Sequence, residues 1–206
     1  MSNEKIAKIS QIFLICLVAV ALNYICSYIC VDILHFPLFM DTIFTVAITF
    51  YFGLFPGLCV GVGFNILSSL TQVVRGFTFD PFTFLFAICS AIIAAVTWFF
   101  SRKKEEFCIS KAITILYLVL IAIISSFLVV LSSGLIDYIR FTVLDIPDRV
   151  APIKQFTESF VDMQFPLLVS SILAQIPISI TDRILTTFLG YGVYKSMVCF
   201  FGEEER

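Results

Sequence analysis

The amino-acid sequence predicts an all-α integral membrane protein: a six-helix transmembrane bundle in a single domain over residues 1–206, with both termini in the cytoplasm. Hydrophobic residues make up 60% of the chain and charged residues only 14%, against about 25% charged residues in an ordinary soluble domain. The apolar residues also form long uncharged runs, which a soluble core of this size does not need. This composition excludes a soluble enzyme and a disordered chain. The net charge of −2 also excludes the basic surface on which nucleic-acid binding depends.

Six segments are apolar enough to cross a bilayer. A helix rises about 1.5 Å per residue and the hydrocarbon core is about 30 Å thick, so one crossing needs roughly 20 residues. The helices are expected at about 10–32, 37–54, 57–75, 81–100, 112–137 and 178–200. The second and third belong to one uncharged run, 42–74, which would be about 50 Å long as a single helix. The pair Pro56-Gly57 marks a turn in this run, so we divide it into two helices.

The segment 138–177 is predicted as an outer loop, with a half-helix within it as one interpretation. Residues 163–181 are uncharged but contain Pro166 and Pro177. They either lead from a surface or half-inserted helix into the sixth helix, or form a separate crossing. We favour six helices because the last apolar run spans the membrane better if it begins near Ile178.

The distribution of Lys and Arg sets the orientation, because cytoplasmic loops carry an excess of both. In the six-helix arrangement, eight of these residues fall on one side and four on the other. The eight are Lys5, Lys8, Arg102, Lys103, Lys104, Lys111, Lys195 and Arg206, and the four are Arg75, Arg140, Arg149 and Lys154. Both termini are therefore expected in the cytoplasm. A seventh helix would make the count six against six and remove the asymmetry.

Polar side chains within or beside the apolar runs are candidates for substrate binding, because ionisable groups at membrane depth are costly. The candidates are Asp41, Asn65, Gln72, Arg75, Asp80, Asp182 and Arg183. For Asp41, a role in starting a helix and a ligand contact are equally plausible, and for Asp80, which precedes Pro81, we favour a helix cap. Asn65 is typical of an interhelical hydrogen bond. Asp182 and Arg183 either form a charge pair that fixes the bundle or contact a polar substrate group.

The alanines Ala87, Ala91 and Ala95 repeat every four residues and form one helical stripe. Small residues let helices approach closely within lipid. Packing inside the bundle is the favoured interpretation, and docking of a partner membrane protein is the alternative.

The sequence contains no recognisable catalytic or metal-binding set. It has no G-x-x-x-x-G-K-[ST] phosphate loop, no H-E-x-x-H, no G-x-S-x-G and a single His. Its seven Cys form no C-x-x-C pair, and we interpret them as small hydrophobic residues. We therefore expect no enzyme activity, no cofactor and no metal.

Five short motifs resemble, in order, the substrate-binding S components of energy-coupling factor (ECF) transporters. They are LFMDTI at 38–43, GLFPG at 53–57, GVGFN at 61–65, DPFT at 80–83 and ITDRIL at 180–185. The resemblance covers most of the chain except 137–162. It is closest to members with an F-L-D-T-I-G start and a G-P-x-x-G turn.

The resemblance implies a six-helix bundle in the inner membrane of a bacterial cell. Such a bundle binds a vitamin or similar micronutrient at the outer face and delivers it with a membrane coupling subunit and two cytosolic ATPases. Carried over to this sequence, it selects Asp41, Asn65, Asp80, Asp182 and Arg183 as the first positions to test. A membrane sensor acting through a separate signalling partner is the alternative function.

Two features depart from the family pattern. Many S components carry A-x-x-x-A on the first helix for docking the coupling subunit, and this chain has Ala19, Asn23 and Ser27 at that spacing. Arg183 stands where Lys is commoner, which exchanges a point charge for a planar fork of donors.

Overall fold

The protein is an all-α bundle of the kind that membranes accommodate. The computed structural model describes residues 3–75, 80–102, 107, 109–143 and 151–202, and this part of the chain contains no strand. Five of its helices are long and apolar enough to cross a membrane, and a sixth apolar helix is shorter. The helices are α1 (Asn3–Ser27), continuing into the π-helix η1 (Tyr28–Ile33), α2 (Ile43–Phe52), α3 (Leu54–Val74), the 3-10 helix η2 (Pro81–Phe86) leading into α4 (Ala87–Ser101), α6 (Lys111–Val143), α7 (Ala151–Asp162) and α8 (Leu167–Phe201).

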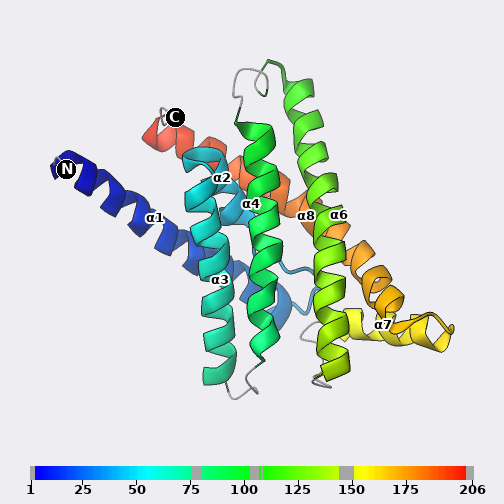
Figure 1. Ribbon diagram of the computed structural model, residues 1–206. Coiled ribbons are helices and arrows are strands. Elements are labelled where there is room, and N and C mark those ends of the chain that lie inside the picture. The colour runs from blue at the N-terminus through cyan, green and yellow to red at the C-terminus, as the bar shows by residue number, and fades with distance from the viewer. Residues whose placement is uncertain (1–2, 76–79, 103–106, 108, 144–150, 203–206) are drawn as a thin grey trace.

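The long helices form two sets that cross each other (Figure 1). Helices α3, α4 and α6 stand side by side, whereas α1 and α8 run obliquely across them. Helix α8 packs against α2 and α6, and α1 packs against α3. The two chain ends lie at one end of the bundle, and the end of α3, the start of α4 and α7 lie at the other.

The turn between α2 and α3 depends on Gly53, which has a φ of +99° that residues with a side chain rarely adopt. Pro56 follows in the first turn of α3, where a missing N–H costs little. A Cβ on Gly57 would lie 2.0 Å from Thr49 Oγ1, so only a residue without a side chain allows α2 and α3 to pack this closely. The predicted division of the apolar run is confirmed, but α3 begins at Leu54 rather than at residue 57.

Helix α2 is shorter than the expected 37–54. It contains ten residues, from Ile43 to Phe52, and is therefore about 15 Å long. Residues 34–42 are not helical, and the backbone N–H of Met40 donates to Asp182 Oδ1 at 2.8 Å. Irregular backbone at membrane depth is tolerated where protein groups satisfy it. The backbone N–H of Met40, which lies outside a helix, is therefore satisfied by this long-range hydrogen bond to α8.

The C-terminal part also differs from the expected boundaries. Helix α8 is continuous through Pro177, so 163–181 does not form a separate crossing and the last helix begins at Leu167 rather than near 178. Helix α6 extends to Val143 instead of ending near 137. The expected outer loop 138–177 contains a separate helix, α7, which packs against α8.

The first helix starts about two turns earlier than expected, and the end of the fourth differs by one residue. Helix α1 with η1 covers Asn3–Ile33 rather than 10–32, and η2 with α4 covers Pro81–Ser101 rather than 81–100.

Asn23 joins α1 to α2 and provides a test of the packing. Its Nδ2 donates to Thr45 Oγ1 at 3.0 Å, and its Oδ1 accepts from the backbone N–H of Phe44 at 2.9 Å. Replacing Asn23 by Ala should lower the free energy of unfolding in bicelles by about 1 kcal/mol, because one buried and one partly buried hydrogen bond are lost. Val18→Ala, at a site on the same helix that is 52% exposed, is the control. An equal effect of both substitutions would contradict this role of Asn23.

Candidate functional site

A cavity of about 140 Å³ lies between the helices and is lined by a mixture of apolar and polar side chains. Its walls come from the end of α1, the segment 34–42, α3, α4, α6, α7 and α8. Its charged lining residues are Asp41, Asp137, Arg140, Asp182 and Arg183. Pockets that bind small molecules have this character, with mostly apolar walls and a few polar groups that orient the ligand.

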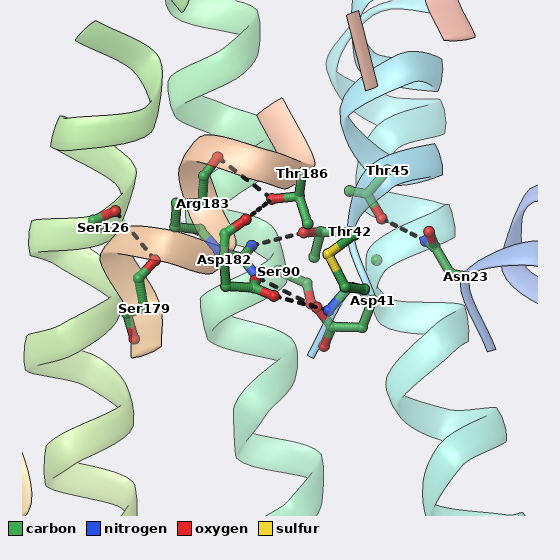
Figure 2. A network of polar contacts seen from close by, with 12 residues as sticks. Asn23, Asp41, Thr42, Thr45, Ser90, Ser126, Ser179, Asp182, Arg183 and Thr186 are labelled. Atoms are coloured by element: carbon green, nitrogen blue, oxygen red, sulfur yellow. Dashed lines mark hydrogen bonds and ion pairs between the residues drawn. The ribbon is translucent and has the colours of Figure 1, made fainter. Parts of the chain in front are cut away.

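Arg183 forms the centre of one polar cluster at the cavity (Figure 2). Its side chain is buried on α8, where Nη1 donates to Thr42 Oγ1 at 2.7 Å and Nη2 contacts Asp41 Oδ1 at 3.4 Å. Nη2 also donates to Asp182 Oδ2. The remaining donor, Nε, is buried and has no hydrogen-bond partner among the described residues. Since Asp182 also accepts from Met40 N–H, the cluster fastens the segment 34–42 to α8.

Arg140 forms a second cluster on the α6 side of the cavity. Its Nε donates to Asp80 Oδ2 and its Nη1 to Asp137 Oδ1, each at 2.9 Å. The second oxygen of Asp137 accepts from Gln175 Nε2, and the second oxygen of Asp80 accepts from the N–H of Phe82 at 2.9 Å. Asp80 is thus the N-cap of η2, which is the role the sequence favoured, and it also neutralises Arg140.

Among the described residues, the guanidinium of Arg140 pairs with Asp80 and Asp137, and that of Arg183 pairs with Asp41 and Asp182. With all six groups ionised, the clusters carry two more negative charges than positive ones. Unpaired charge is costly in a low-dielectric interior, so the region attracts positive charge and repels anions.

The uncharged candidates lie on α3. Asn65 Nδ2 donates to Gly61 O at 2.8 Å and to Ser90 Oγ at 2.9 Å, so it connects α3 to α4 and lines the cavity as well. Gln72 also lines the cavity.

Arg75 and Asp80 do not line the cavity, whereas Asp41, Asn65, Gln72, Asp182 and Arg183 do. Arg75 pairs with Asp32 at 3.1 Å and lies over the ring of Tyr28. The hydrogen bond that Arg75 donates to Asp32 raises the pKa of the Arg75 guanidinium, which stays charged.

Of the five charged residues that line the cavity, Asp137 and Arg140 were not among the sequence candidates, and the amide of Gln175 lines it as well. The spacing of Asp137 and Arg140 is a usable signal, because residues three apart share one face of a helix. The expected helix end near residue 137 placed Arg140 in a loop and concealed this signal.

The residues considered for partner docking lie in two different environments. Ala19, Asn23 and Ser27 are buried inside the bundle. On α4, Ala87 and Ala91 are half-buried and Ala95 is exposed. Within the described residues, no group of three His, Cys, Asp or Glu side chains is placed to hold a metal ion.

Asp182 should be needed for folding. Asp182→Ala leaves buried Arg183 without its nearest carboxylate and releases the Met40 N–H. We expect a loss of about 3 kcal/mol in the free energy of unfolding, measured by denaturant titration in detergent. Asp32→Ala, which breaks the more exposed pair with Arg75, should cost less than about 1 kcal/mol. Similar losses for the two variants would mean that the Arg183 cluster does not stabilise the fold.

Comparison of the chain with family models, with curated proteins and with solved structures finds no match. The resemblance to ECF S components therefore rests on the five sequence motifs.

Proposed function

We propose that this protein is the S component of an ATP-driven ECF importer in the inner membrane of a bacterium. In this proposal it binds a vitamin or similar micronutrient at the outer face. It then delivers the molecule across the membrane together with a coupling subunit and two cytosolic ATPases. The observation that carries the proposal is a cavity between the helices whose mostly apolar lining includes three carboxylates and two guanidinium groups.

The cost of the buried charges supports a binding role. A bundle that only had to pack could replace ion pairs by apolar side chains at no loss of stability. This chain instead places two guanidinium groups and four carboxylates at or beside a cavity of about 140 Å³. Ionisable groups at membrane depth usually serve a substrate path or a ligand.

The positions of the cations support an outward-facing cavity. Lys8 lies near the start of α1, Arg102 follows α4, Lys111 begins α6 and Lys195 lies near the end of α8. These helix ends lie at the end of the bundle where the two chain ends lie. The excess of Lys and Arg marks the cytoplasmic side, so this end is assigned to the cytoplasm. The start of α4 and α7, next to the cavity, then face the outside.

Purification of the full chain should recover a bound small molecule and the partner subunits. We expect native mass spectrometry to detect one retained molecule per chain. We also expect the chain to co-elute with a co-expressed coupling subunit and ATPase pair. Recovery of a kinase in place of ATPases would favour the alternative function, a membrane sensor, and would count against the importer.

The stripe on α4 is the proposed docking face for the coupling subunit, since Ala95 is exposed on it. Ala95→Leu should lower the co-eluting fraction of that subunit severalfold, because the larger side chain prevents close approach of a partner helix. Ala112→Leu, at an exposed position of α6, is the matched control. Unchanged co-elution of the Ala95 variant, with the fold intact, would remove this face from the proposal.

A further inference from the structure

The charge imbalance of the two clusters indicates what kind of ligand the cavity prefers. Arg140 is shared by Asp80 and Asp137, and Arg183 by Asp41 and Asp182. An anionic ligand would add to an existing excess of negative charge in a low-dielectric region, whereas a cation would reduce that excess.

One carboxylate of the four has capacity for a further partner. Asp182, Asp80 and Asp137 each accept hydrogen bonds on both oxygens. Asp41 differs, because its contact with Arg183 is 3.4 Å long and its side chain is 22% exposed. Asp41 also lines the cavity, so it is the carboxylate that an incoming cation can reach.

The cavity walls favour an organic cation over a hydrated ion. Phe39, Phe64 and Phe86 line the cavity together with Ile93 and Val129. Aromatic faces attract organic cations, and apolar walls exclude the water that a hydrated ion keeps. The volume of about 140 Å³ is close to the roughly 150 Å³ of an engineered protein cavity that binds benzene. A molecule built on one ring therefore fits.

An independent observation also indicates a ligand. Nε of Arg183 is a buried donor with no partner among the described residues, and the Arg183 side chain lines the cavity with 4% of its surface exposed. A buried donor without an acceptor is costly. A ligand that carries a neutral acceptor would remove this cost without competing with the cation for Asp41.

We propose that the cavity binds a single-ring organic cation, with its ammonium or amidinium group at Asp41 and a neutral hydrogen-bond acceptor at Nε of Arg183. This inference names the substrate class of the site described above and rests on the proposed function.

Three probes of similar shape test the charge preference on the full chain in nanodiscs: benzylammonium, benzyl alcohol and benzoate. Affinities are measured by saturation-transfer NMR titration. We expect benzylammonium to bind roughly tenfold more tightly than benzyl alcohol, as one charged hydrogen bond provides, and benzoate to bind least. Equal binding of the three, a preference for benzoate, or no binding of any of them would overturn the inference. This comparison needs no variant and so does not depend on the folding of one.

Asp41→Asn then tests the assigned residue. The substitution keeps the side-chain size and should reduce benzylammonium binding to the level of benzyl alcohol, leaving benzyl alcohol unchanged. Asp32→Asn is the control, because Asp32 is also paired with an arginine but does not line the cavity. An unchanged preference for benzylammonium in the Asp41 variant would show that the cation binds elsewhere.

The proposed acceptor at Nε of Arg183 is tested with the three ring isomers of aminomethylpyridine. In each of them, a neutral ring nitrogen replaces one ring CH of benzylammonium. At least one isomer should bind severalfold more tightly than benzylammonium. If none does, the acceptor at Arg183 is refuted.

Failure of this inference and failure of the importer proposal give different results. A retained molecule that mass spectrometry identifies as an anion would refute the cation and leave the importer intact. Benzylammonium preference without co-elution of a coupling subunit would retain the ligand class and refute the importer.

Discussion

The arrangement of the cavity depends on the pairing of one buried guanidinium. An arginine side chain is not deprotonated in proteins, so Arg183 must find negative and polar partners inside the bundle. Its guanidinium donates to Asp182 on the same helix, and to Asp41 and Thr42 on the segment before α2. Asp182 holds the same segment through Met40. These bonds fix the non-helical residues 34–42 against α8, shorten α2 and leave the cavity beside them.

The fold could be predicted where hydropathy alone decides the structure. Uncharged runs located the long helices, and the need to divide 42–74 followed from its length. Hydropathy could not locate the start of α2, because the backbone N–H of Met40 donates to Asp182, a residue 142 positions away in the sequence. Pro177 likewise indicated a helix start near 178. Packing of α8 against α6 and α2 allows the helix to continue through it, as it does in many membrane helices.

The site was predictable where the sequence placed charge inside an apolar run. Asp41, Asp182 and Arg183 were found on that basis, and the structure brings them together. Arg75 carried the same signal, but it lies at the end of α3 and pairs with Asp32 at the surface. Arg140 gave no such signal, because charges after an apolar run resemble a loop. Because α6 continues to Val143, Arg140 lies on the helix one turn after Asp137, and both side chains line the cavity.

Under the proposed importer function, the electrostatics of the site also constrain how a cargo would be carried. With the cavity empty, the two clusters hold an excess of negative charge, which is least costly near the water outside. A bound cation at Asp41 reduces that excess and therefore lowers the cost of exposing this region to the hydrocarbon core. Under the proposed ligand class, any movement that carries the site deeper into the membrane is easier for the loaded protein than for the empty one. If the protein is the importer component proposed above, binding would then favour delivery through the charge balance of the site itself, before ATP hydrolysis by the proposed partner subunits contributes.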